Sequence, residues 1–286
     1  MPILCQLLLI VLDCLPRRAG GGCLLYLLMS STLKLVVLRP ARWLRTIATA
    51  LALLSPLAGC RHDTDAEPTF GGPELYPLTV GTYRVFAVAD TVWQQNQPTI
   101  STYQRREVVA DSFPGPATTL GAPSISYRVV QSRRATAAQA WREDSVLVLT
   151  PLPLALLLSQ GNRRTLELLF PVRAGRGPWN RLAFDASDSL SREYRHLGEA
   201  LTLAGPGAAA KTYASTVRTV DVDAADNLYQ RTYEQIYAPG VGPVQRRRRH
   251  LDTYVRQPDG QQTPNPNYIF EGYTHLEVLV EMGRMK

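Results

Sequence analysis

Apolar and polar residues alternate along most of the chain from residue 75 onward. After a turn at Gly81, residues 83, 85 and 87 fall on one face of an extended segment and residues 84, 86 and 88 on the other. A period of two with aromatic and β-branched residues is typical of a β-strand. The same kind of pattern predicts further strands at 99–109, 125–131, 146–149, 166–172, 212–222, 228–236, 247–255 and 275–280.

Turn signals separate these strands and indicate the fold class. Gly, Pro and Asn gather at 113–116, 160–162, 204–207 and 257–260. Short, regularly spaced strands predict an all-β, mostly antiparallel fold over residues 75–286, either a sandwich or an open barrel. We expect one or two short helices, at 135–142 and 187–195. About 210 residues fit a single domain of this class, and a two-lobed arrangement with a joint near 175–178 stays open.

One segment, at 146–158, is strongly apolar but contains Pro151 and Pro153. Because proline lacks a backbone N–H and restricts φ, these positions argue against a central strand or a helix interior. The pattern favours a buried strand followed by an apolar crossing segment. The alternative is the lining of a hydrophobic ligand cavity in an open barrel.

A short stretch far upstream, Leu57-Ala58-Gly59-Cys60, looks like a bacterial lipobox, at which a lipoprotein precursor is acylated and cut. It follows an apolar segment at 46–56 and three basic residues, Arg39, Arg42 and Arg45. A positive segment, a short apolar segment and small residues before the cut are the parts of a secretory signal. We therefore predict lipidation at Cys60. The alternative is an ordinary thiol after an ordinary signal or a short membrane anchor.

The upstream sequence then divides into three segments. A signal of 59 residues is longer than the usual 15–30, whereas a start at Met29 gives a signal peptide at 29–59. We interpret residues 1–28 as a misread upstream extension, with an N-terminal transmembrane segment as the alternative. Residues 60–74 are polar and then rich in Gly and Pro, which predicts a flexible tether.

Cysteine usage and charge exclude several function classes. Cys5, Cys14 and Cys23 lie upstream of the predicted cut, so the mature chain would keep only Cys60 and could form no internal disulfide.

The whole chain has 31 basic and 24 acidic residues. Six of the basic residues and Asp13 precede Cys60, which leaves 25 and 23, a net charge of +2. The high pI is mostly a property of the signal, so no nucleic-acid partner is expected.

Three blocks of sequence resemble uncharacterised β-rich lipoproteins of Gram-negative bacteria. They are Tyr76–Phe86, with the pattern PLxVGxYxV; Leu169–Gly175 followed by Trp179-Asn180, with the pattern LFPVxxG and WN; and Tyr233–Val244, with the pattern YAxGVGxV. The blocks occur in the family's order and span nearly the whole mature domain. This chain departs from the pattern at Thr82, Arg84, Arg181 and Pro243. The resemblance implies a lipoprotein with a β-rich fold and supplies no catalytic residues.

A search for reactive motifs finds little. No serine lies in a GxSxG motif and no HExxH motif occurs. The four histidines, His62, His196, His250 and His275, have no ligand spacing, so no metal and no cofactor is expected. Residues 221–227 resemble a calcium loop but lack its Gly and its Glu, and a hairpin turn explains them better. We expect a protein that is not an enzyme, with no catalytic residues assigned.

The strongest local charge feature is the run of four arginines at 246–249. Alternation along a strand places Arg246 and Arg248 on one face and Arg247 and Arg249 on the other. One interpretation is an edge strand whose charges discourage pairing with other molecules. The other is a site that binds anionic lipid, lipopolysaccharide or glycan phosphate, because guanidinium groups suit oxyanions.

The sequence therefore predicts a lipid-anchored lipoprotein of a Gram-negative cell envelope, placed in the outer membrane on its periplasmic or surface face. We expect a non-enzymatic binding or structural module with an envelope protein, glycan or lipid partner, and of unknown oligomeric state. A periplasmic carrier of a lipid or other apolar ligand is the alternative. An envelope hydrolase is a further alternative.

Overall fold

The computed structural model describes residues 69–117, 123–222 and 227–285, which lie in one compact unit, Asp63–Lys286. The predicted extension, signal peptide, lipobox and Cys60 lie outside the described residues, as does most of the predicted tether. In the part of the chain that is described, no helix has the length and hydrophobicity needed to cross a membrane.

The described residues form strands and one short 3₁₀ helix. In chain order the elements are η2 (Pro73–Leu75), β1 (Thr82–Gln94), β2 (Gln97–Pro114), β3 (Ile125–Arg134), β4 (Arg142–Leu152), β5 (Ala155–Gln160), β6 (Arg163–Leu169), β7 (Trp179–Asn180), β8 (Ser191–Leu203), β9 (Lys211–Val222), β10 (Tyr229–Ala238), β11 (Gly242–Asp252), β12 (Tyr254–Arg256), β13 (Gln262–Pro264) and β14 (Glu271–Arg284). The predicted all-β, antiparallel class is confirmed.

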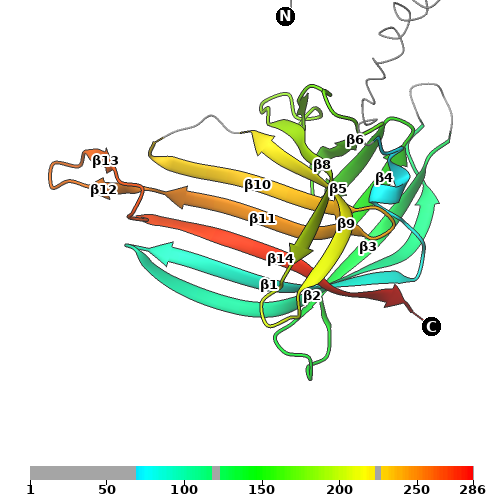
Figure 1. The fold of residues 1–286 in the computed structure, drawn as a ribbon, viewed down its shortest axis with the longest axis horizontal. Helices are drawn as coiled ribbons and strands as arrows, with labels where there is room; N and C mark the ends of the chain where they lie inside the picture. Colours follow the sequence, from blue (N-terminus) through cyan, green and yellow to red (C-terminus); the bar gives the residue numbers. More distant parts are fainter. Residues whose placement is uncertain (1–68, 118–122, 223–226, 286) are drawn as a thin grey trace, which may run out of the picture. The chain divides into compact units, whose positions relative to one another are not determined.

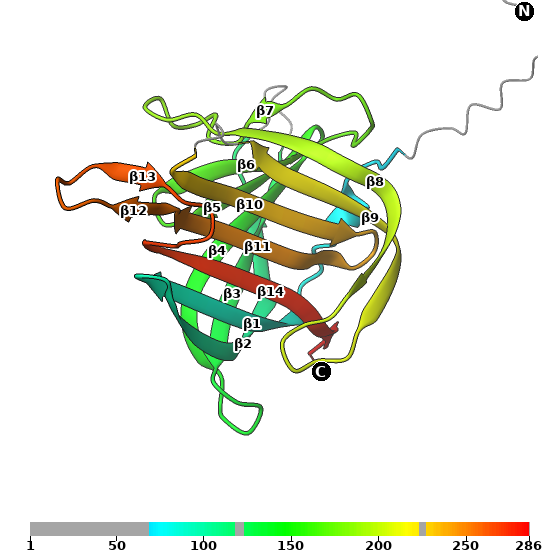
Figure 2. The ribbon, with the colours of Figure 1, turned by 60° about the vertical axis from the view of Figure 1, so that its left-hand side comes forward.

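Twelve of these strands form one antiparallel sheet that curls into an almost closed barrel (Figures 1 and 2). The order is β6-β5-β4-β3-β2-β1-β14-β11-β10-β9-β8-β7, with β12 and β13 forming a separate hairpin. Two meanders thus run outward from a central pair, β1 and β14, whose register extends from Thr82↔Arg284 to Gln94↔Glu271. β6 and β7, which precede and follow residues 175–178, belong to the same sheet. The described strands therefore do not divide into two lobes at this point.

The two outer strands of the sheet, β6 and β7, meet at a seam without forming a regular ladder. The Leu166 N–H donates to the carbonyl of Arg181 at 2.9 Å, and the Trp179 indole donates to the Leu166 carbonyl at 3.1 Å. The Tyr194 hydroxyl on β8 accepts from the Leu169 N–H at 2.8 Å and donates to its carbonyl at 2.7 Å. Side chains therefore satisfy edge groups of β6 that strand pairing leaves free.

The seam explains why the helix predicted at 187–195 is wrong. Residues 191–195 begin β8, where Arg192 is fully buried and Tyr194 contacts the edge of β6. These contacts require an extended backbone, and tertiary contacts outweigh a weak helical preference. The helix predicted at 135–142 is also wrong, because residues 135–141 form the loop between β3 and β4.

The hairpin of β8 and β9 bends over the outside of the sheet. His196 and Gly198 have positive φ values of 52° and 77°, and the register with β9 shifts at this point. The far end of the hairpin reaches β1 and β14, where a Cβ added to Gly205 would lie 3.3 Å from the Cβ atoms of both Ala87 and Val278. This hairpin supplies a second layer over part of the sheet.

The segment before β1 closes one end of the curled sheet. Leu75 and Tyr76 are buried in a core cluster with Phe170, Val172 and Tyr237. The Gly240 N–H donates to the Glu74 carbonyl at 2.8 Å, which ties η2 to the turn between β10 and β11. Arg84 inside the sheet donates to the carbonyls of Pro77 at 2.8 Å and Val241 at 2.9 Å. The interior is therefore sealed at the end where η2 lies.

The apolar segment at 146–158 forms two paired strands, β4 and β5, so the apolar crossing segment predicted after the first strand is wrong. Pro151 lies in β4 and pairs with Leu156 of β5, but the ladder of β4 with β3 ends at Leu149↔Tyr127. Pro151 lies beyond the end of that ladder, so its lack of an N–H removes no hydrogen bond to β3. A proline is tolerated in a strand at such a position. Pro153 and Leu154 form the turn to β5.

Candidate functional site

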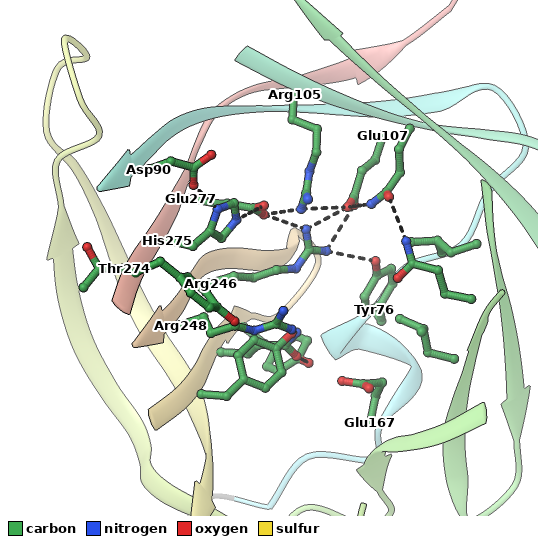
Figure 3. Close-up of a pocket in the computed structure, with 18 of the residues that line it drawn as sticks. Tyr76, Asp90, Arg105, Glu107, Glu167, Arg246, Arg248, Thr274, His275 and Glu277 are labelled. Carbon is green, nitrogen blue, oxygen red and sulfur yellow. Dashed lines mark hydrogen bonds and ion pairs between the residues drawn. The ribbon is translucent and has the colours of Figure 1, made fainter. Parts of the chain in front are cut away.

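The curled sheet encloses a cavity of about 620 Å³ (Figure 3). Its lining comes from β1, β2, β3, β4, β5, β6, β10, β11 and β14 and from Tyr76 near the sealed end. Among the described lining residues, aliphatic side chains occur at Val92, Leu147 and Leu158. The others are polar, charged or tyrosine. Because inward positions of a barrel sheet are normally apolar core, a polar interior of this size marks a candidate binding site.

An ion-pair network crosses the middle of this cavity. Arg246 on β11 binds Glu107 on β2 with both terminal nitrogens, at 2.7 Å and 3.1 Å, and Glu277 on β14 at 3.1 Å. Arg105 also hydrogen-bonds Glu277. Gln131 on β3 donates to Glu107 at 3.0 Å. Both carboxylates have several donors, as buried charges require.

The guanidinium groups decide the protonation of these carboxyls. Burial alone would raise the pKa of Glu107, but Arg246 and Arg105 outweigh it, and the pKa is lowered. The same balance, with Arg105 and His275 opposing burial, lowers the pKa of Glu277 to about 2. Both groups are carboxylates at neutral pH.

A histidine extends the network toward β1. His275 hydrogen-bonds Glu277 through Nε2 at 2.6 Å and Asp90 through Nδ1. Burial would lower the pKa of His275, but these two carboxylates outweigh it and raise the pKa. Since both ring nitrogens face a carboxylate, the geometry favours the doubly protonated imidazolium, in which each nitrogen donates.

A second network lies near the seam. Glu167 on β6 accepts from Arg192 at 2.7 Å and from Arg181 at 2.9 Å, and Thr165 donates to it at 2.6 Å. Arg192 also binds Asp221 on β9 at 2.5 Å. Burial raises the pKa of Glu167, but the two arginines outweigh it and lower the pKa to about 2. This network joins β6 to β8 and β9 and so reinforces the seam.

Tyrosines of β10 lie between the two networks. Tyr233, Gln235 and Tyr237 line the cavity and are joined by hydrogen bonds through Gln235. Three guanidinium carbons lie close to the centre of the Tyr233 ring, those of Arg181 at 4.8 Å, Arg192 at 5.0 Å and Arg248 at 4.8 Å. At the sealed end, burial and the charge of Glu107 raise the pKa of Tyr76 to about 12. The Tyr76 hydroxyl is therefore a neutral donor and acceptor at physiological pH.

The arginine run lies on a central strand. Arg246 and Arg248 line the cavity, while Arg247 and Arg249 alternate with them and are exposed. The four arginines therefore alternate between the inner and outer faces of β11, as predicted. The interpretation as an edge strand is wrong, because β11 pairs with β10 on one side and β14 on the other. Inside the sheet, Arg246 neutralises buried carboxylates, a role that alternation alone does not reveal.

Two other predicted segments have structural roles. Asp221, at the start of the calcium-like stretch, pairs with Arg192. The strands on either side of that stretch, β9 and β10, form the predicted hairpin, and residues 223–226 lie outside the described part. Within the described ranges, no group of three or more His, Cys, Asp or Glu residues could hold a metal ion. Of the segment at 146–158, Leu147 and Leu158 contribute to the cavity.

Apart from Arg246 and Arg248 of the arginine run, sequence reasoning missed the residues that build this site. Glu107, Glu277 and His275 are not in any motif, yet each lies at the centre of the polar interior. A signal was present, because Arg105 and Glu107 are spaced by two, as are His275 and Glu277, on the strand face that burial would reserve for apolar residues. Charged residues on both faces of a strand indicate a polar interior.

The arrangement suits binding better than acid catalysis. A general acid needs a raised pKa near the working pH. Glu107, Glu167 and Glu277 have the opposite shift because arginines hold them ionised. His275 has both nitrogens engaged. The cavity therefore presents fixed hydrogen-bonding groups.

Comparisons with known proteins give one weak similarity to report. No family model matches the chain, and no curated protein sequence matches it. A matching solved structure is that of a protein from Parabacteroides distasonis, proposed to be a lipoprotein, with 9% sequence identity and a TM-score of 0.33. The match covers 73% of this chain and 98% of that one. A similarity of this size is too weak to assign a family or an activity.

Proposed function

We propose that this chain is a lipid-anchored lipoprotein of the bacterial cell envelope that binds a small polar ligand inside its curled sheet. The observation that carries the proposal is the cavity of about 620 Å³ lined by ion-paired and hydrogen-bonding side chains. Ligand sites of proteins commonly have volumes of about 300–1,000 Å³. A polar ligand would displace water from the cavity and form hydrogen bonds with side chains that are already held in place.

Preorganisation supports binding as the role of the interior. Each carboxylate at the cavity centre is fixed by at least two donors, and Gln131 is held in turn by Ser145 at 2.6 Å. Fixed groups lose little conformational entropy when a ligand binds, which favours affinity and selectivity. Burying so many charges serves stability poorly compared with apolar packing. A binding role explains why the interior is polar.

The lipid anchor rests on the sequence. The stretch Leu57–Cys60 with its preceding apolar and basic segments supports acylation at Cys60 and a place in the envelope of a Gram-negative bacterium. A membrane tether would hold a binding domain where envelope solutes pass. An apolar carrier would use Val92, Leu147 and Leu158, but most of the lining would then face hydrocarbon without partners, at a high cost in free energy.

The test is to identify what the protein carries. The full chain would be expressed in a Gram-negative host, extracted from membranes with mild detergent, and examined by native mass spectrometry with separate organic and aqueous extraction. We expect a water-soluble molecule at close to one per protein. A stoichiometric lipid, or no bound molecule together with no binding from aqueous envelope extract, would overturn the proposal.

A pair of variants shows whether the molecule lies in the cavity. Ser101 lines the cavity and Thr102 lies next to it on the opposite face of β2, and both are exposed. Ser101→Phe should fill space in the cavity and remove the bound molecule, whereas Thr102→Phe should keep it. Equal loss in both variants would place the molecule elsewhere.

A further inference from the structure

Arg248 differs from the arginines of the two ion-pair networks. It faces the cavity two residues after Arg246, and its guanidinium carbon lies 4.8 Å from the centre of the Tyr233 ring. Arg105, Arg246, Arg181 and Arg192 each form an ion pair with a carboxylate. Arg248 forms no ion pair within 4 Å with any carboxylate in the described part of the chain. Its positive charge is stabilised mainly by Tyr233 and Tyr273, with a smaller, longer-range contribution from Asp221.

The charges of the two networks otherwise balance. With His275 protonated, the cations that have carboxylate partners are Arg105, Arg246, His275, Arg181 and Arg192. The carboxylates that receive them are Glu107, Glu277, Asp90, Glu167 and Asp221. Arg248 is thus one positive charge in excess. A cation that lines a cavity and has no ion-paired carboxylate favours an anionic ligand.

The position of Arg248 suits a ligand that enters from solvent. Tyr273 and Val92, which also line the cavity, are 37% and 50% exposed, whereas Arg246 is 8% exposed. Arg248 itself is exposed. It therefore lies between the solvent-facing part of the lining and the buried network. Its forked donors can bind two oxygens of one oxyanion, while the tyrosine rings limit its movement.

We propose that the ligand of this cavity carries an oxyanion group, a carboxylate or a phosphate, that binds the Arg248 guanidinium. The proposal rests on the proposed function and adds the charge of the ligand and the residue that recognises it. The polar remainder of the ligand lies against the buried networks and the β10 tyrosines. Arg247, on the outer face, takes no part.

The experiment compares Arg248→Gln with Arg247→Gln in the full chain purified from membranes. Both variants remove one positive charge from an exposed position of β11, on opposite faces. Native mass spectrometry gives the occupancy, and negative-ion mass spectrometry with ³¹P detection of the extract separates a phosphate from a carboxylate. A titration with inorganic phosphate at constant ionic strength, followed by ³¹P line shifts, measures affinity for a simple oxyanion.

We expect an anionic molecule on the parent protein and on Arg247→Gln, and its loss from Arg248→Gln. Affinity for inorganic phosphate should fall by about tenfold to a hundredfold in Arg248→Gln, as expected for losing charge-assisted hydrogen bonds. Arg247→Gln should leave it unchanged. Thermal unfolding confirms that both variants are folded.

Other outcomes separate this proposal from the one on which it rests. A neutral polar molecule retained by Arg248→Gln would overturn the oxyanion assignment and leave the polar binding site in place. Equal losses of phosphate affinity in both variants would show a general charge effect and overturn the role of Arg248. A parent protein that binds neither an aqueous molecule nor phosphate would overturn both proposals.

Discussion

Arg246 and Glu107 form a bidentate ion pair although two strands separate them in the sheet. Their distances are 2.7 Å and 3.1 Å, and β1 and β14 lie between β2 and β11 in the strand order. The pair can form only because the sheet curls until inward side chains from non-adjacent strands meet (Figure 3). The contact links residues 139 positions apart and ties the two meanders together across the interior.

Removing the charge of Glu107 should destabilise the fold strongly. Glu107→Gln leaves Arg246 and Arg105 with one buried carboxylate fewer, and breaking a buried ion pair costs about 3–5 kcal/mol. Urea unfolding followed by circular dichroism measures the change. Glu143→Gln, at an exposed position of β4, should change the free energy of unfolding by less than about 0.5 kcal/mol. A loss below about 1 kcal/mol in Glu107→Gln would mean that the pair contributes little.

Stability should fall on both sides of mildly acidic pH. The folded pKa of Glu277 is about 2 against an ordinary 4.5, so its contribution is present above pH 4.5 and is lost as pH falls from 4.5 toward 2. The pKa of His275 is raised above its ordinary 6.5. Its contribution is therefore complete below pH 6.5 and is lost as pH rises through the folded value.

Urea unfolding across pH measures both limbs of this profile. His275→Gln should flatten the alkaline limb, and Glu277→Gln the acid one. An alkaline limb that persists unchanged in His275→Gln would show that another group causes it.

The seam should depend on the hydroxyl of Tyr194. Tyr194→Phe removes both hydrogen bonds to Leu169 and leaves an N–H and a carbonyl of β6 without them, at about 1–3 kcal/mol. Hydrogen exchange of β6 amides should accelerate. The matched control is Tyr213→Phe, which removes a buried hydroxyl that has no hydrogen-bond partner among the described residues. It should be neutral or slightly stabilising, and equal losses in the two variants would contradict the role of the seam.

One glycine of β14 should not tolerate a side chain. Gly272 has a φ of +142°, and a Cβ there would lie 2.3 Å from the backbone oxygen of His250 on β11. Because backbone cannot move aside easily, Gly272→Ala should cost about 2 kcal/mol or more. Gly161 has a φ of +56° with nothing within 4 Å of a built Cβ, so Gly161→Ala should cost about 1–2 kcal/mol from its backbone alone. Thermal unfolding measures both, and a smaller loss at Gly272 would be unexpected.

The lipid anchor gives a cellular prediction. Two or more acyl chains hold a protein stably at a membrane, whereas one binds only marginally. The parent protein should therefore stay in the membrane fraction through salt washing, and Cys60→Ala should leave the precursor uncut or release the protein. Incorporation of labelled palmitate provides a second readout. A cleaved Cys60→Ala protein that still requires detergent for extraction would contradict lipidation at this residue.

The sequence predicted the fold class and most strands because a period of two is a local property. The strand predicted at 99–109 covers most of Gln97–Pro114, and the alternation at 83–88 marks the first half of Thr82–Gln94. Strand β8 was missed because Arg192 and Tyr194 gain their partners from β6 and β9, which lie far away in sequence. Apart from Arg246 and Arg248, the candidate site was missed for the same reason. Glu107 and Glu277 become neighbours only through the curl of the sheet, which local patterns do not encode.

The pairing of β1 with β14 has a consequence for how this protein is made. β14 pairs with β1 on one side and β11 on the other, so it joins the two meanders of the sheet. A chain synthesised and exported from its N-terminus holds two separate meanders until residues 271–284 arrive. Contacts between distant parts of a chain form slowly. The interior can therefore close only after residues 271–284 have been delivered, and a nascent chain that lacks β14 exposes the edges of β1 and β11.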